Sequence, residues 1–252
     1  MSKVIAVANQ KGGVGKTTTA VNVSACLADI GKKTLLIDTD PQANATSGLG
    51  VDPRQISLSI YHILMDGIAV SDATIPTELK RLSLVPANFD LTGAEVEMVS
   101  LLAREGRLRT ALQTVRDDYD YIIIDCPPSL GLLTLNTLTA CDSILIPIQC
   151  EYYALEGLGQ LLETIALVRD NLNPDLQIEG ILLTMQDKRV KLSAQVIDEV
   201  KSFFEGQVYK TIIPRNVRLS EAPSFGKPII LYDSRSSGAQ AYRKLAREMV
   251  RK

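Results

Sequence analysis

The sequence predicts an α/β fold, with a mainly parallel, twisted sheet and helices on both of its faces. Short runs rich in Val, Ile and Leu, each bounded by turn residues, alternate with segments of helical spacing along the chain. Repeated strand, helix, strand order favours parallel strands joined by right-handed crossovers. No repeat, low-complexity tract or Pro/Gly-rich linker divides the 252 residues, so we expect one domain over residues 1–252.

Seven segments are expected to be buried strands because they are short and almost continuously apolar. They are Lys3–Ala8, Thr34–Ile37, Leu82–Val85, Tyr121–Ile124, Ser143–Ile148, Ile178–Leu183 and Val208–Ile213. The longest helical pattern is Tyr153–Leu172. The longest loop-like stretch, Thr39–Pro53, directly follows a buried strand, and long loops in that position are usually functional.

The composition is that of an ordinary soluble globular protein. The chain is 46% hydrophobic and 22% charged, with a mean hydropathy of +0.09. It contains no apolar run near the roughly 20 residues that a membrane span needs, and it opens directly into a strand pattern. The four cysteines form no Cys-x-x-Cys pair. We therefore expect reduced thiols, a cytoplasmic location and no membrane span.

The charges are distributed unevenly although the net charge is only −2. Residues 1–185 carry a net charge of −9, and residues 186–252 carry +7. A basic C-terminal quarter is compatible with binding to phosphate backbones or anionic lipid, but a solvated helical surface would look the same.

A glycine-rich loop follows the first predicted strand and leads into a helical pattern. Its sequence is Asn9-Gln10-Lys11-Gly12-Gly13-Val14-Gly15-Lys16-Thr17-Thr18-Thr19. This is the context of a phosphate-binding loop, in which glycines let backbone N–H groups turn toward an anion. Lys16 can neutralise phosphate oxygens, and the Thr17 hydroxyl can bind Mg²⁺. The usual G-x-x-x-x-G-K-[ST] spacing would place Gly where this chain has Gln10, and a second lysine, Lys11, begins the loop.

That departure resembles the deviant Walker A motif of the ParA/MinD superfamily of P-loop ATPases. Three further stretches agree with the resemblance, most closely to chromosomal ParA proteins of the Soj type. They are Leu36-Ile37-Asp38-Thr39-Asp40-Pro41-Gln42, the segment from Tyr121 to Ser129, and the segment from Ile213 to Pro223. The resemblance spans nearly the whole chain and implies ATP, ADP and Mg²⁺ as ligands. It also implies weak ATPase activity.

Acidic residues end two of the predicted strands. Asp125 follows four apolar residues, so it can hold Mg²⁺ directly or through water. Asp38 and Asp40 lie two residues apart at another strand end, and both can face the phosphates, although they could also simply cap a turn before Pro41. We expect Thr17, Asp38 and Asp125 as metal ligands. The resemblance implies that Asp40 positions the attacking water.

The resemblance also assigns the other nucleotide contacts. It implies that Lys11 reaches across a dimer to the nucleotide of the second subunit, although Lys11 could instead act within its own subunit. Catalytic roles then fall to Asp40, Lys11 and Lys16. Residues 11–18 would hold the phosphates through Lys11, Gly12, Gly13, Val14, Gly15, Lys16, Thr17 and Thr18, and adenine would lie near Met185, Pro214 and Asn216.

The resemblance implies two macromolecular partners. Soj-like proteins bind double-stranded DNA non-specifically as ATP-bound homodimers, and a ParB-like centromere-binding protein stimulates their hydrolysis. Arg189 and Arg218 are the residues we expect to contact DNA. Such contacts need only point charges and give salt-sensitive affinity. The implied process is chromosome or plasmid partition, with the protein associated with the nucleoid.

Three other protein classes use a similar loop. A MinD-like peripheral membrane ATPase would need a lipid-binding helix, and the final helical pattern offers an apolar stripe of Tyr242, Leu245, Ala246 and Met249. We interpret this stripe as core, because one stripe can hardly serve both purposes. An iron–sulfur reductase would need paired cysteines, and a metabolic synthetase would need an additional acid–base cluster. Neither is evident in the sequence.

Overall fold

The computed structural model describes residues 2–151 and 158–252. Its strands form one seven-stranded sheet in the order β3-β4-β2-β5-β1-β6-β7. The strands are β1 Lys3–Val7, β2 Thr34–Asp38, β3 Ile75–Pro76, β4 Leu82–Val85, β5 Tyr121–Asp125, β6 Ser143–Gln149 and β7 Gln177–Thr184. All neighbouring strands are parallel except the short edge strand β3, which pairs antiparallel with β4. The predicted α/β fold class is confirmed.

Helices connect the strands and cover the sheet. The α-helices are α1 Lys16–Asp29, α2 Asn44–Gly48, α3 Ile60–Asp66, α4 Val70–Ala73, α5 Leu91–Glu97, α6 Arg107–Leu112, α7 Leu132–Ala140, α8 Leu158–Asn171, α9 Lys191–Phe203, α10 Val217–Glu221, α11 Ile229–Tyr232 and α12 Ser237–Arg251. Single 3₁₀ turns occupy Pro53–Gln55, Met98–Ser100, Arg104–Gly106, Arg116–Asp118 and Ala222–Phe225.

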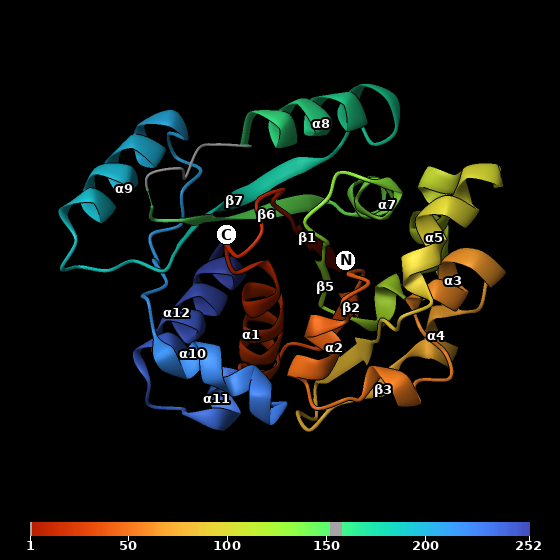
Figure 1. Cartoon of the computed structure of the whole chain (residues 1–252), viewed down its shortest axis with the longest axis horizontal. Helices are drawn as coiled ribbons and strands as arrows, with labels where there is room; N and C mark the ends of the chain where they lie inside the picture. Colours follow the sequence, from red (N-terminus) through yellow and green to blue (C-terminus); the bar gives the residue numbers. More distant parts are fainter. Residues whose placement is uncertain (1, 152–157) are drawn as a thin grey trace.

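Two apolar cores lie on opposite faces of the sheet. Along β1, Val4 and Ala6 pack into one core while Ile5 and Val7 pack into the other, because alternate side chains of a strand point to opposite faces. Helices α7 and α8 cover the first face, and α1 and α12 cover the second (Figure 1). Strands buried on both faces explain why the strand sequences are continuously apolar.

The stripe predicted for the final helix lies in this second core. Tyr242, Leu245, Ala246 and Met249 are all at most 1% exposed. The interpretation of this stripe as core is therefore confirmed, and α12 packs against α1 with its apolar face.

The parallel register brings the chemistry-bearing residues to one edge. Val7 of β1 and Asp38 of β2 both stand opposite Asp125 of β5. The carboxyl ends of these three central strands therefore meet, and the loops that follow them share the same edge of the sheet, which is where ligands bind in open α/β sheets.

One predicted strand is wrong. Val208–Ile213 forms only an isolated bridge to Ile181, beside the edge strand β7. The backbone N–H groups of Lys210 and Thr211 donate to the Glu248 carboxylate of α12, at 2.8 and 3.1 Å, instead of joining a strand ladder. A side chain from the final helix thus interrupts the pairing, which resumes where Ile213 donates its N–H to the carbonyl of Leu183 at 2.9 Å.

Two other boundaries differ from expectation. The expected loop Thr39–Pro53 contains the short helix α2, which is stabilised where Thr46 donates from its backbone and hydroxyl to Asp38. The helix expected over Tyr153–Leu172 is described from Leu158 onward, and residues 153–157 lie outside the described residues. The strand β3 had no signal in the sequence because it has two residues, one of them proline.

Candidate nucleotide-binding site

The glycine-rich loop joins β1 to α1 and surrounds open space. Gly13 and Gly15 have φ values of 74° and 91°, in the left-handed region that favours glycine. A Cβ placed on Gly12 or Gly13 would meet nothing within 4 Å. The loop is therefore an open cradle at the N-terminus of a 14-residue helix, which is suited to bind an anion.

Hydrogen bonds to two strands of the sheet hold this cradle in place. Asn9 donates from Nδ2 to the carbonyl of Pro147 at 2.7 Å, and its Oδ1 accepts from the backbone N–H of Lys11 at 3.0 Å. On the other side, the Thr184 hydroxyl donates to the carbonyl of Val14 at 2.9 Å. Strands β6 and β7 thereby fix both ends of the loop.

The two loop lysines occupy different environments. Lys16 is only 7% exposed, and its Nζ donates to the carbonyl of Lys11 at 3.1 Å. Burial lowers the pKa of Lys16, while the nearby carboxylates of Asp125 and Asp40 oppose that shift. Lys11 is half-buried at the start of the loop. Lys16 is therefore buried inside the cradle, whereas Lys11 stands half-buried at the start of the loop, the position that we call its rim.

Asp125 is a buried carboxylate whose oxygens are unpaired within the described part of the chain. Both oxygens are inaccessible to solvent and accept no hydrogen bond from the described residues. Burial, and next the charge of Asp38, raises the pKa of Asp125 well above its usual range, while the Thr17 hydroxyl acts in the opposite direction. Unpaired carboxylate oxygens beside a hydroxyl are suitable ligands for Mg²⁺, so Asp125 and Thr17 fit the expected metal.

Asp38 already has hydrogen-bond partners. One oxygen accepts from Thr46, at 2.8 Å from its backbone N–H and 2.7 Å from its hydroxyl, and the other accepts from the backbone N–H of Asp40 at 3.1 Å. Burial raises the pKa of Asp38 to about 6. Through Thr46, Asp38 positions α2, and its expected role as a metal ligand stays a prediction.

Asp40 begins a constrained turn at the same edge. Its Oδ1 accepts from the backbone N–H of Gln42 at 2.9 Å, and the residue is 6% exposed. The turn ends at Ala43, whose φ of 51° is rare for a residue with a Cβ. The turn therefore gives Asp40 a fixed direction near Asp125 and Lys16.

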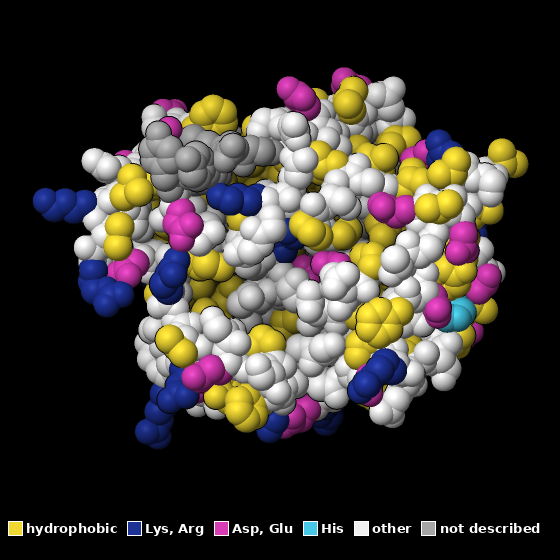
Figure 2. Space-filling model, in the orientation of Figure 1, with side chains coloured by type: hydrophobic (Ala, Val, Ile, Leu, Met, Phe, Trp, Pro, Cys, Tyr) yellow, Lys and Arg dark blue, Asp and Glu magenta, His cyan; other side chains and the backbone are white. Residues whose placement is uncertain are grey.

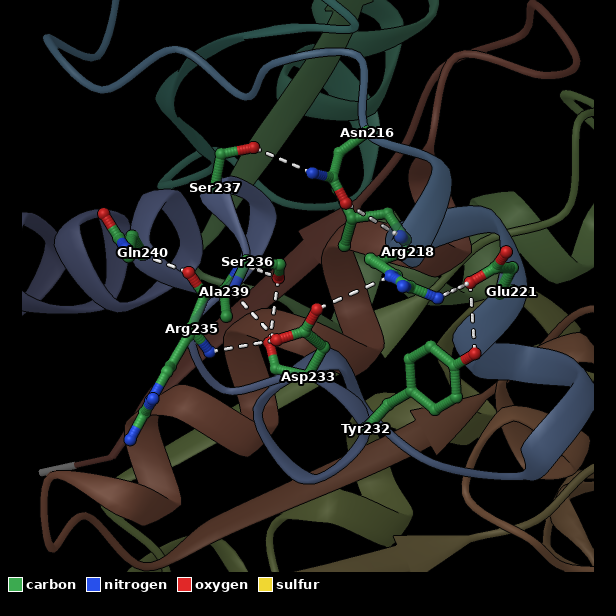
Figure 3. Close-up of polar contacts among 11 residues, drawn as sticks. Asn216, Arg218, Glu221, Tyr232, Asp233, Arg235, Ser236, Ser237, Ala239 and Gln240 are labelled. Atoms are coloured by element: carbon green, nitrogen blue, oxygen red, sulfur yellow. Dashed lines mark hydrogen bonds and ion pairs between the residues drawn. The ribbon is translucent and has the colours of Figure 1, made fainter.

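A cavity of about 320 Å³ adjoins the loop where adenine is expected. Met185, Pro214 and Asn216 all line it, and so does Gly15 of the cradle. The Asn216 amide has partners within the fold, because Nδ2 donates to the Ser237 hydroxyl at 2.8 Å and Oδ1 accepts from the N–H of Leu219 (Figure 3). The amide keeps a second N–H on Nδ2 and a second lone pair on Oδ1, with which Asn216 could recognise an adenine edge.

The similarity of this chain to curated proteins identifies its family. A family model described as an AAA domain matches residues 2–178. The sporulation initiation inhibitor protein Soj of Bacillus subtilis is 61% identical over 99% of this chain and 99% of its own length. The chromosome partitioning protein ParA of Myxococcus xanthus is 58% identical over 100% of this chain and 89% of its own length. This chain belongs to the ParA/Soj family of chromosome-partitioning ATPases.

A solved structure supports the same fold. Cobyrinic acid a,c-diamide synthase from Mycobacterium smegmatis, with bound ADP and magnesium, matches this ParA/Soj chain with a TM-score of 0.88 and 41% identity. The match covers 100% of this chain and 95% of that one. The nucleotide and metal in that structure are consistent with the cradle and the Asp125 site described above.

The two arginines expected to contact DNA belong to segments that also line the cavity where adenine is expected. Arg189 lies in the turn between β7 and α9, four residues after Met185. Arg218 lies in the short helix α10, which begins directly after Asn216. Lys and Arg side chains on this face gather mostly over α9 and α10–α12 (Figure 2).

Some residues of the ParA/Soj site could not be found from the sequence. Tyr242 lines the cavity where adenine is expected, and its hydroxyl forms a 3.1 Å hydrogen bond with that of Thr19 on α1. Its position in an apolar stripe indicated only a core residue.

Among the described residues, no helix has the length and apolar character needed to cross a bilayer.

Proposed function

We propose that this ParA/Soj ATPase is a switch that dimerises with ATP and binds DNA non-specifically in the dimeric state. The observation that carries the proposal is the two-lysine cradle, with Lys16 inside it and Lys11 at its rim, beside the buried carboxylate of Asp125. Family membership supports ATP hydrolysis in chromosome partition.

Within one subunit, the chain's own groups have separate tasks. Lys16 and the backbone N–H groups of residues 12–17 bind the phosphates, and the cavity beside Met185 and Pro214 takes the adenine ring. Thr17 and Asp125 would hold Mg²⁺, which neutralises charge that develops on the phosphate oxygens. Asp40 orients the attacking water, and its fixed turn limits the reorganisation that this requires.

Dimerisation follows from Lys11. Lys11 is half-buried at the start of the loop, and in this proposal its ammonium group contacts a nucleotide bound by a second subunit, so that two subunits would enclose two ATP molecules. Hydrolysis would remove the γ-phosphate that both subunits bind and thereby release the dimer. Intrinsic turnover is slow in this proposal, and a ParB-like partner accelerates it.

DNA binding uses Arg189 and Arg218 as phosphate contacts. Both side chains are exposed, at 87% and 54%, and neither lies in the phosphate loop. A dimer presents two copies of each arginine, which multiplies weak backbone contacts. The protein would then associate with the nucleoid in the cytoplasm.

The MinD-like membrane alternative is not favoured. The apolar stripe of α12, which a lipid-binding helix would have to expose, is buried against α1. Phospholipid vesicles provide the corresponding control, because pelleting of the ATP-bound protein with them would support the membrane alternative.

The decisive experiment is DNA binding measured with ATP, with ADP and without nucleotide, with Mg²⁺ present throughout. We expect the protein to bind duplex DNA of any sequence only when ATP is present. Size-exclusion chromatography should show a dimer in the same condition. Equal DNA binding in the three conditions would refute the switch.

A further inference from the structure

Each of the two arginines expected to contact DNA is paired with carboxylates of its own chain. Arg189 forms a two-pronged ion pair with Asp187, with Nε to Oδ1 at 3.0 Å and Nη2 to Oδ2 at 2.7 Å. Asp187 also accepts from the backbone N–H of Arg189 at 3.0 Å, which fixes the carboxylate beside the turn. The Arg189 side chain is 87% exposed, whereas that of Asp187 is 21% exposed.

Arg218 lies between two carboxylates. Its Nη1 contacts Glu221 at 2.8 Å and its Nε contacts Asp233 at 3.6 Å (Figure 3). Other groups hold both acids, because Tyr232 donates its hydroxyl to Glu221 at 3.1 Å and the N–H groups of Arg235 and Ser236 donate to Asp233. In both pairs the acid is anchored and the exposed arginine is the partner that can move.

We infer that Asp187 and Glu221 set the DNA affinity of this protein by competing with DNA phosphates for Arg189 and Arg218. Carboxylate and phosphate oxygens accept from the same N–H groups of a guanidinium, so a full phosphate contact requires the arginine to leave its acid. Each acid also repels the DNA backbone. The inference rests on the proposed DNA binding. It adds two acidic residues that lower the affinity for DNA.

The pairs can exchange because they are exposed to solvent. Exposed ion pairs contribute little to stability, so DNA can displace the acid at a modest cost in affinity. The segments that carry the two arginines also form one surface. Gln186 donates its N–H to the carbonyl of Ile213 at 3.0 Å, and Arg215 donates its N–H to that of Gln186 at 2.9 Å. A phosphate backbone that reaches this surface meets arginines that are already neutralised.

The test compares the full chain with its Asp187→Asn variant, using a 24-base-pair duplex with ATP and Mg²⁺ and following binding by fluorescence anisotropy. We expect Asp187→Asn to bind DNA roughly two- to fivefold more tightly, the scale set by an exposed pair. Glu221→Gln tests the Arg218 pair in the same way. Asp233 is left unchanged because it also binds the N–H groups that precede α12.

Two controls separate release of the arginine from a general change in charge. Asp198→Asn removes an equal charge from an exposed residue of α9 that makes no ion pair with the described residues. The gain from Asp187→Asn should exceed the gain from Asp198→Asn. In an Arg189→Ala background, Asp187→Asn should produce no more gain than Asp198→Asn.

The possible outcomes are distinct. If the parent binds DNA but Asp187→Asn and Glu221→Gln gain no more than Asp198→Asn, the competition is refuted while the proposed function stands. If Asp187→Asn still gains more DNA affinity than Asp198→Asn in the Arg189→Ala background, the acid acts on DNA without the arginine. That result also refutes the competition. If neither the parent nor any variant binds DNA with ATP, the proposed function fails and the inference fails with it. Dimer content, measured in parallel, should be the same in all variants.

Discussion

Thr184 and Val14 join the end of β7 to the phosphate loop, since the Thr184 hydroxyl donates to the Val14 carbonyl at 2.9 Å. The two residues are 2% and 1% exposed, so water cannot replace the bond. We expect Thr184→Val to cost about 1–3 kcal/mol of unfolding free energy, the penalty for a buried carbonyl left unpaired, and to weaken ATP binding by loosening the loop. Urea denaturation and calorimetric titration with ATP measure the two effects. Thr184→Ser, which keeps the hydroxyl, should resemble the parent in both, and an undiminished unfolding free energy in Thr184→Val would contradict this role.

Replacing either of the two loop lysines should cause a different defect. Lys16→Ala removes the cation fixed inside the cradle, so we expect nucleotide binding to be lost. Lys11→Ala should keep nucleotide binding and lose ATP-dependent dimerisation, because Lys11 lies at the rim. Nucleotide titration and size-exclusion chromatography distinguish the two variants. Normal binding and normal dimerisation in both would refute the role of Lys11 across the dimer.

Asp125 should reduce the stability of the nucleotide-free protein in a pH-dependent way. Its pKa is raised by burial, so the folded state favours the protonated form and stability falls as the pH rises above the ordinary carboxyl pKa. Asp125→Asn has no such charge. We therefore expect the variant to be more stable than the parent at pH 7.5, with a smaller difference at pH 5, and to lose Mg²⁺-dependent ATP hydrolysis. Thermal unfolding without nucleotide at the two pH values measures the difference. A variant less stable than the parent at pH 7.5 would show that the carboxylate has a stabilising partner.

Reversing the charge of both arginines should remove DNA binding without affecting the nucleotide site. Arg189→Glu together with Arg218→Glu places acids beside Asp187 and Glu221, so each pair becomes repulsive. We expect ATP-dependent dimerisation to persist. The milder change of both arginines to Ala should reduce the dependence of log affinity on log salt by about 0.9 for each DNA phosphate that an arginine no longer neutralises. An unchanged affinity and salt slope would place the DNA-binding surface elsewhere.

The phosphate loop and Asp125 could be predicted because the signals are contiguous in the sequence: an apolar strand, then glycines or an acid, then a helix. The bonds that position them could not be predicted. Thr184 and Val14 are separated by 170 residues, and Tyr242 and Thr19 by 223. The error at residues 208–213 has the same cause, since no local pattern indicates that Glu248 takes the N–H groups of that segment. Site residues that lie in contiguous motifs could therefore be predicted from the sequence, whereas hydrogen bonds between distant segments could be identified only from the fold.

The environment of Asp40 allows catalysis to be separated from binding. Its carboxylate accepts from the backbone N–H of Gln42 and directs the turn, whereas the ammonium group of Lys16 donates to the carbonyl of Lys11 in the loop. A residue that orients water acts mainly in the transition state, so its removal should lower turnover by orders of magnitude and change ATP affinity little. We expect Asp40→Ala to accumulate as an ATP-bound dimer.

Because DNA affinity depends on the dimer in the proposed function, Asp40→Ala should also remain on DNA after the parent protein has dissociated. The measurement loads both proteins with ATP and Mg²⁺ and follows phosphate release, dimer content and DNA occupancy over time. Asp40→Asn is the matched control, since its amide oxygen can still accept from Gln42 and keep the turn while the charge is removed. If Asp40→Asn hydrolyses at the parental rate, the charge of Asp40 is not needed for catalysis. If Asp40→Ala fails to bind ATP while Asp40→Asn binds it, the residue serves the turn rather than the water.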